Sequence, residues 1–360
     1  MKKSVILIIV LCLLLSGCSN WLNGNYSSVV PHTEPNEQIN TPSASIANYF
    51  QTKLELISMV KNGTESAVLT ILYPSDKDAE ADMIKAIDEV CRTDPYAVYA
   101  VQGIRYELGT SSGQSAIHVQ ITYRQNRVDV KTIHAVKDVE EAKLLIAEQL
   151  DACSSGVVFY CESWGQPDYA QIVADYALKN PHQVIEEPEV TVNSYPERGM
   201  KQIVELKFTY QTSRDSLRVM QSHVAVVFNS AEQSVDPAAS EMERHEQLYN
   251  FLMNRYSSYE ISTSITPAYS LLRHGVGDER AFATVYAAMC GRVGLNCEVV
   301  TGTRDGKLWT WNVIEMDGIY YHLDVLRSRE AGQFHTYTGE EMTGYVWDYS
   351  LYPFAREKIS

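Results

Sequence analysis

The sequence has few cysteines, and they form no pattern that points to a metal site. None of its seven cysteines belongs to a CxxC motif or to a Cys/His spacing typical of zinc ligands. Five remain after the first 18 residues, and an odd number cannot all pair within one chain, so we expect no disulfide framework. We therefore expect no metal and no cofactor. Whether Cys153 and Cys161 pair stays open.

The chain also lacks a run of basic residues. It carries 30 Lys and Arg against 45 Asp and Glu, a net charge of -15. An acidic chain without a basic patch argues against nucleic acid as a partner and against electrostatic attachment to anionic lipid. With 45% hydrophobic and 21% charged residues the composition is that of a globular protein, and 360 residues predict two or three domains.

The apolar run at the start of the chain is too short to span a membrane as a mature helix. Lys2 and Lys3 precede Val5 to Leu15, and Leu15-Ser16-Gly17-Cys18 follows. A basic segment, an apolar run and small residues in this order are typical of a secretory signal peptide. We therefore exclude residues 1–17 from the fold.

The tetrapeptide ending at Cys18 resembles the bacterial lipobox. That resemblance implies that Cys18 is lipidated, with palmitate among its acyl groups, and becomes the mature N-terminus. The protein would then be a lipoprotein anchored to the cell membrane, facing outside the cytoplasm, with the lipid bilayer as a partner. An ordinary cleaved secretory peptide is the alternative.

Residues 18–45 are rich in Asn, Ser, Thr and Pro and contain only scattered apolar residues. Such a segment cannot bury enough surface to order itself. We predict a disordered tether that holds the folded part away from the membrane.

Residues 46–235 contain two similar units. Asp94-Pro95 and Thr122-Tyr123 in the first are echoed by Asn180-Pro181 and Thr209-Tyr210 in the second, at offsets of 86 and 87 residues. A shared offset favours duplication. We predict two small α+β modules, over 46–150 and 151–235, each reading strand, helix, strand, strand, followed by a last domain over 236–360.

The last domain contains one helix pattern and three strand patterns. Apolar residues at 282, 285, 286 and 289 have the spacing of a helix with one buried face, and Asp278 is a credible N-cap. A β-branched run at 298–301 is followed by two longer runs, 309–316 and 319–326, which flank Asp317-Gly318, a strong hairpin signal. A two-residue turn there places Met316 opposite Ile319 and, counting outward, Trp311 opposite Asp324, which makes Trp309 the diagonal neighbour of Asp324.

These segments resemble the transglutaminase-like superfamily, whose members share a papain-like core with a Cys, His, Asp triad. The segments that carry the resemblance are Ala268-Tyr269-Ser270-Leu271-Leu272, Gly277-Asp278-Glu279-Arg280-Ala281-Phe282-Ala283, Trp309-Thr310-Trp311-Asn312 and Tyr321-His322-Leu323-Asp324. The resemblance covers roughly the last third of the chain. It implies an α+β fold in which a papain-like domain follows the two modules.

The differences from the family fall on its catalytic residues. Glu279 lies where the nucleophilic Cys is expected and Trp309 where the His is expected, whereas Asp324 is retained. Acyl transfer of this kind needs a thiolate activated by an imidazole. A carboxylate is a poor acyl nucleophile and an indole nitrogen only donates. No catalytic residue set is intact, so we predict a pseudoenzyme.

Structural roles also explain these residues. A negative Glu279 in the first turn is favoured by the helix dipole, Trp309 and Trp311 can be core or groove aromatics, and His322 can be a partnered strand histidine. A sharper hypothesis is that the Trp309 indole donates to Asp324 in place of the imidazole, which leaves a satisfied and inert groove.

Two functions remain open. The favoured one is a surface lipoprotein whose inactive domain binds a peptide, a protein or a cell-wall component in a groove formed by Glu279, Trp309, Trp311, His322 and Asp324. The alternative is an active hydrolase or transferase that uses Glu279 and Asp324 as an acid/base pair, or another cysteine as nucleophile. Cys290 lies on nearly the same face of the helix, but it is roughly 16 Å further along than Glu279 and therefore too far away to replace it directly.

Overall fold

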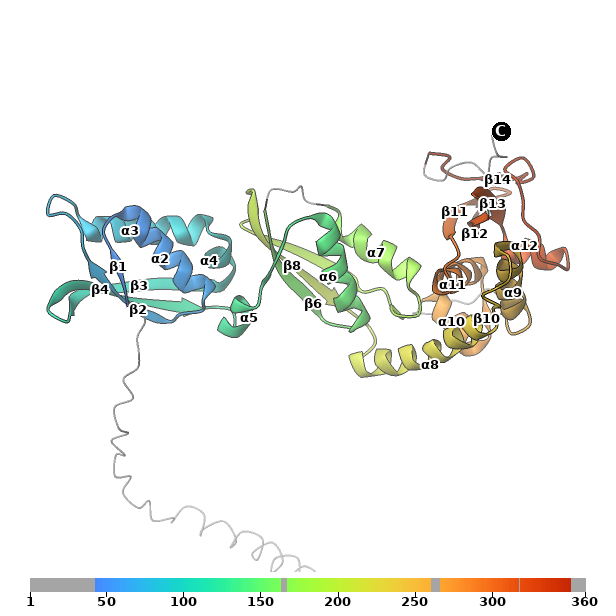
Figure 1. The fold of residues 1–360 in the computed structure, drawn as a ribbon, viewed down its shortest axis with the longest axis horizontal. Helices are drawn as coiled ribbons and strands as arrows, with labels where there is room; N and C mark the ends of the chain where they lie inside the picture. Colours follow the sequence, from blue (N-terminus) through green and yellow to red (C-terminus); the bar gives the residue numbers. More distant parts are fainter. Residues whose placement is uncertain (1–42, 163–166, 260–265, 317, 351–360) are drawn as a thin grey trace, which may run out of the picture.

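The computed structural model describes residues 43–162, 167–259, 266–316 and 318–350. Three mixed α/β units follow one another along its long axis (Figure 1). The predicted signal peptide, the predicted lipidation site Cys18, most of the predicted tether and Asp317 lie outside the described residues. Within them, no helix is both long enough and apolar enough to cross a bilayer. The mixed α+β class predicted from the sequence is confirmed.

The first unit is a four-stranded sheet covered by helices. Its strands have the order β1-β2-β4-β3, with β1 parallel to β2 and the other neighbours antiparallel. The elements are β1 (Ser43–Ile46), α2 (Tyr49–Lys61), β2 (Ser66–Ile71), α3 (Ala79–Thr93), α4 (Pro95–Ala100), β3 (Val101–Ser111), β4 (Gln114–Tyr123) and α5 (Arg127–Lys131).

The second unit repeats this topology. Its sheet has the order β5-β6-β8-β7, again with the first pair parallel and the others antiparallel. This equivalence is what a duplicated unit requires. The elements are β5 (His134–Val136), α6 (Val139–Asp151), β6 (Gly156–Glu162), α7 (Tyr169–Lys179), β7 (Glu189–Tyr195) and β8 (Lys201–Thr209).

The predicted module boundaries need correction. The strand β5 and the helix α6 pair and pack with the second sheet, so the first unit ends before His134 and not at 150. The strand β1 starts at Ser43, inside the predicted tether. Each unit therefore begins with a strand and a helix that were absent from the predicted order. The two missed strands are only four and three residues long, too short to show an alternating pattern.

The third unit combines helices with a four-stranded sheet of order β13-β12-β11-β14, in which all neighbours are antiparallel. The short strands β9 and β10 form a separate parallel pair. The elements of the third unit are α8 (Arg214–Gln233), α9 (Glu241–Met253), β9 (Ser257–Ser258), α10 (Pro267–His274), β10 (Val276–Gly277), α11 (Glu279–Arg292), β11 (Cys297–Arg304), β12 (Lys307–Met316), β13 (Ile319–Leu323), α12 (Val325–Glu330) and β14 (Tyr345–Val346). The predicted start at 236 is too late, because Leu217, Val224 and Phe228 of α8 are buried in the core of this unit.

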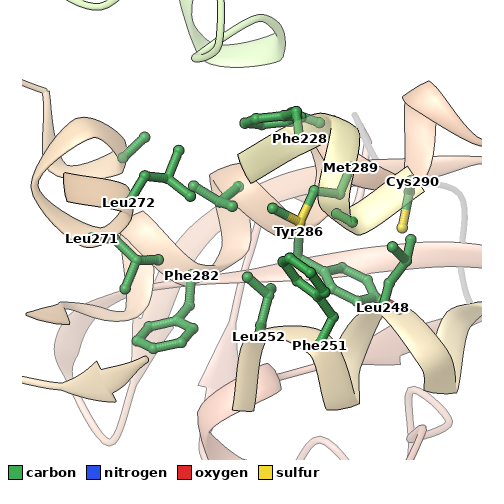
Figure 2. Close-up of a cluster of buried hydrophobic side chains, with 14 of the residues drawn as sticks. Phe228, Leu248, Phe251, Leu252, Leu271, Leu272, Phe282, Tyr286, Met289 and Cys290 are labelled. Atoms are coloured by element: carbon green, nitrogen blue, oxygen red, sulfur yellow. The ribbon is translucent and has the colours of Figure 1, made fainter. Parts of the chain in front are cut away.

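The helix α11 is the central element of that core. Asp278 caps it by accepting the Ala281 N–H at 2.8 Å, as its sequence predicts. Phe282 and Tyr286 are fully buried among side chains from α8, α9 and α10, as Figure 2 shows. Because α11 is packed on nearly every side, its position relative to the sheet is fixed, and with it the position of Glu279.

The hairpin has the predicted register. Met316 pairs with Ile319, and the ladder continues outward to Asn312 opposite Leu323. Gly318 has φ +75°, the left-handed conformation that glycine adopts without strain. The ladder stops one residue short of Asp324, which is not a strand residue.

Candidate functional site

Asp324 lies at the junction between β13 and α12. Its Oδ1 accepts the backbone N–H groups of Leu326 and Arg327, each at 3.0 Å, so it is the N-cap of α12. This corrects the predicted strand, which continued to Leu326. Capping fixes the carboxylate by satisfying two of the free N–H groups at the start of the helix.

The other carboxylate oxygen of Asp324 binds two side chains. Oδ2 accepts the Trp309 indole N–H at 2.7 Å and the Tyr345 hydroxyl at 2.6 Å. The Arg304 guanidinium lies 3.7 Å from the same oxygen. An ionised carboxylate has about four acceptor positions. All four are used, and Asp324 is only 1% exposed.

The second buried pair joins Trp311 and His322. The indole Nε1 of Trp311 donates to Nδ1 of His322 at 3.0 Å, and both residues are buried. Burial lowers the pKa of His322 to about 4. Because Nδ1 accepts, the proton of the neutral ring belongs on Nε2, which has no hydrogen-bond partner within the described part of the chain.

An aromatic cluster covers this pair. The His322 ring lies 4.6 Å from the Trp347 ring, and the Trp311 ring lies 5.2 Å from the Tyr345 ring. Tyr345 therefore contacts both Trp311 and Asp324. The predicted partnered histidine is confirmed, and its partner is Trp311.

Glu279 is the first residue of α11 and is partly exposed. Its negative charge lies in the first helical turn, where the helix dipole favours it. The structure thus places the residue at the helix N-terminus that the sequence predicts.

The family comparison matches this region. Residues 229–347 match the model of the transglutaminase-like superfamily, a segment that runs from α8 to β14 and contains Glu279, Trp309 and Asp324. This segment is a transglutaminase-like domain. The predicted resemblance is confirmed for the last third of the chain.

The comparison with solved structures matches this chain to a TGase, at 10% identity and TM-score 0.26, covering 61% of this chain and 63% of that one. A protein from Cytophaga hutchinsonii, described as a putative cysteine protease, is 13% identical with TM-score 0.27, and covers 41% of this chain and 65% of its own. A protein from Parabacteroides distasonis, described as a putative protease, is 11% identical with TM-score 0.24, and covers 71% and 40%. This chain thus spans less than two thirds of each of these structures. No curated protein matches it.

The predicted groove of the transglutaminase-like domain is largely closed. Trp311, His322 and Asp324 are at most 1% exposed, so only Glu279 and Trp309 of the five predicted groove residues retain accessible surface. All acceptor positions of the Asp324 carboxylate are occupied by hydrogen bonds within the protein. Asp324 therefore has no acceptor position left for a substrate or water, as the predicted acid/base pair with Glu279 would require.

A different cysteine and histidine of the transglutaminase-like domain meet elsewhere. Cys290 Sγ lies 3.6 Å from Nδ1 of His245, and Tyr286 Oη lies 2.9 Å from the same nitrogen. The sequence places Cys290 too far from Glu279 to replace it, and His245 is not among the predicted site residues. A histidine on an amphipathic helix 45 residues upstream carries no local signal of this contact. Among the described residues, no group of three or more His, Cys, Asp or Glu could hold a metal ion.

Proposed function

We propose that the protein is a lipid-anchored surface protein whose transglutaminase-like domain performs no acyl transfer and instead binds a peptide, a protein or a cell-wall component. Cys18 would carry the lipid, and the domain would face outside the cytoplasm. The proposal combines the lipobox at Cys18 with the chemistry of Glu279 and Trp309.

One observation carries the proposal of inactivity. The hydrogen bond from Trp309 Nε1 to Asp324 Oδ2 is the contact expected if an indole takes the role of the family's imidazole N–H. The indole satisfies the carboxylate but cannot accept a proton, and Glu279 cannot supply a thiolate. The Tyr345 hydroxyl donates to the same oxygen, so the hydrogen bonds that the Asp324 carboxylate accepts are satisfied without a catalytic histidine.

A small exposed apolar surface on the same sheet supports a binding role. Leu308 in β12 and Val346 in β14 are 74% and 60% exposed. Both pair with Thr303, one on each side of β11. Directly opposed residues of neighbouring strands share a face, so the two side chains form a small apolar row at this end of the sheet. Trp309, the next residue of β12, points to the opposite face of the sheet, so this row is a separate surface. Exposed apolar groups of this kind suit a peptide or protein ligand.

The proposal of inactivity is tested by direct assay. The mature chain is incubated with a glutamine-containing peptide and a primary amine, with released ammonia as readout, and separately with an unfolded protein as protease substrate. We expect the same background rate for the wild type, for Glu279→Gln and for Cys290→Ser. Turnover by the wild type that either substitution abolishes would contradict inactivity.

The binding arm uses purified peptidoglycan and an immobilised peptide library as probes. We expect the wild type to be retained by one of them, and a Leu308→Ser plus Val346→Ser variant to be retained at least tenfold less. Arg92→Ser, on the exposed face of the first unit, is the matched control. Equal retention of all three proteins would show that Leu308 and Val346 do not form the binding site.

The contact between Cys290 and His245 favours a second candidate function, an active thiol hydrolase or transferase. Against it, both residues are 0% exposed, so no peptide substrate reaches the sulfur in this structure. The assay above separates the two functions, because Cys290→Ser abolishes turnover only in the second.

A further inference from the structure

Cys290 and Cys297 are close together although neither is bonded. Cys290 lies in the last turn of α11, and Cys297 is the first residue of β11 after a tight turn containing Gly294 in the left-handed conformation. Both are free cysteines, and each lies near enough to the other to shift its pKa.

His245 and Tyr286 surround the Cys290 sulfur. The Tyr286 hydroxyl donates its single proton to the carbonyl oxygen of His245 at 3.0 Å. Its 2.9 Å contact with His245 Nδ1 therefore makes Nδ1 the donor, and the same N–H faces Cys290 Sγ at 3.6 Å. A neutral imidazole N–H thus points at this sulfur.

The two thiols differ in acidity. Burial opposes ionisation of Cys290, but hydrogen bonds from Cys297 and His245 outweigh it and lower the pKa of Cys290. Burial and the neighbouring Cys290 raise the pKa of Cys297. Of the two thiols, Cys290 is therefore the more easily ionised. Figure 2 places Cys290 in the buried core with Leu248 and Tyr286.

Cys297, in contrast, reaches a cavity. A pocket of about 580 Å³ lies between α7 of the second unit and α11 with β11, and Cys297 forms part of its wall. Lys179 and Glu298, 3.6 Å apart, line the same pocket. Cys297 lines this pocket and the buried Cys290 does not, so a small molecule in the pocket meets Cys297 first.

We propose that Cys290 and Cys297 are a redox-active pair that closes to a disulfide when a small-molecule disulfide enters this pocket. The proposal does not depend on the proposed function. It assigns thiol–disulfide exchange to the end of α11 and the start of β11, a site that includes neither Glu279, Trp309 nor Asp324.

The exchange balances in two steps. Cys297 passes its proton to the Cys290 thiolate, and the resulting Cys297 thiolate attacks one sulfur of the small disulfide, forming a mixed disulfide and releasing one small thiolate. That thiolate removes the proton from Cys290, which attacks the Cys297 sulfur and releases the second small thiolate. The two cysteines are oxidised, and the small disulfide is reduced to two thiols, one of which remains ionised.

Peptide mapping tests the proposal. The full chain is reduced, exposed to glutathione disulfide, quenched with N-ethylmaleimide and digested with trypsin. Cleavage after Arg280, Arg292 and Arg304 places the two cysteines in separate peptides, 281–292 and 293–304. We expect these peptides to be joined in most molecules and to separate on reduction. Recovery of both peptides unlinked, or linked to Cys91, Cys153 or Cys161, would overturn the proposal.

Single substitutions check the order of attack. In Cys290→Ser the reaction should stop at a glutathione adduct on Cys297, whereas in Cys297→Ser the buried Cys290 should stay free. Cys91→Ser is the matched control and should leave the linked peptide unchanged. If the wild type links but Cys297→Ser forms an adduct at Cys290, the assigned role of Cys297 is wrong. Should either variant fail to fold, the wild-type map still decides.

Discussion

The indole nitrogen of Trp309 lies 2.7 Å from Oδ2 of Asp324 and donates to it. In the transglutaminase-like superfamily, the residue at the Trp309 position is expected to be a histidine. On the proposed assignment the hydrogen bond is kept while the base is lost. The Asp324 carboxylate itself caps α12 and accepts the indole N–H.

The shared oxygen predicts coupling between Trp309 and Tyr345. Trp309→Phe and Tyr345→Phe each remove one donor to Asp324, and each should lower the free energy of unfolding by about 1–3 kcal/mol because a buried carboxylate loses a hydrogen bond. Substitutions of two residues that share one partner do not have additive effects on stability. The change in the free energy of unfolding of the double variant should therefore differ from the sum of the two single changes by about 0.5 kcal/mol or more.

Urea unfolding of the four proteins measures this coupling. Leu308→Ala, on the same strand but exposed, is the matched control and should change stability by less than about 0.5 kcal/mol. Strictly additive effects of the two substitutions would show that the two donors act independently.

The buried His322 predicts a pH dependence. Its folded pKa, about 4, lies below its unfolded value of about 6.5. The unfolded state therefore binds more protons between these values, and the stabilisation present above pH 6.5 should be lost as the pH falls towards 4. The loss is about 3 kcal/mol from this group.

Urea midpoints between pH 4 and pH 7.5 measure that loss. His322→Gln should show a shallower fall than the wild type, whereas His335→Gln, an exposed histidine nearby, should show the wild-type slope. Parallel slopes for all three proteins would mean that His322 does not stay neutral on folding.

The lipobox predicts the location of the protein. Cys18→Ala should release the chain from the membrane fraction of a bacterial host and abolish incorporation of labelled palmitate. Cys91→Ala, in the first unit, should change neither. Unlabelled wild-type protein in the soluble fraction would favour the ordinary secretory peptide.

Much of the site could be predicted because it depends on local pattern. The Asp-Gly turn and period-2 alternation fixed the register from Met316 opposite Ile319 to Asn312 opposite Leu323, and the diagonal placement of Trp309 and Asp324 followed. Asp278 was a recognisable cap for the same reason.

Features that depend on distant contacts could not be predicted. Asp324 looked like a strand residue because the apolar run continues to Leu326, and only the backbone turn into α12 makes it a cap. Trp311 and His322 are covered by Tyr345 and Trp347, which lie in and just after β14, more than 20 residues later in the chain. No sequence spacing links His245 to Cys290, since α9 and α11 meet only in the folded core.

The central claim is that Glu279 and Trp309 occupy the positions of the family's thiol and imidazole. The most direct test is the thiol pKa at position 279 in a Glu279→Cys plus Trp309→His variant, measured from the pH dependence of iodoacetamide alkylation followed on the peptide that contains position 279. Glu279→Cys alone is the control. The account predicts a normal thiol in the single variant, with a pKa of about 8.5, and a pKa at least one unit lower in the double variant, because an imidazole on Asp324 stabilises the thiolate. Identical alkylation profiles for the two variants would contradict it.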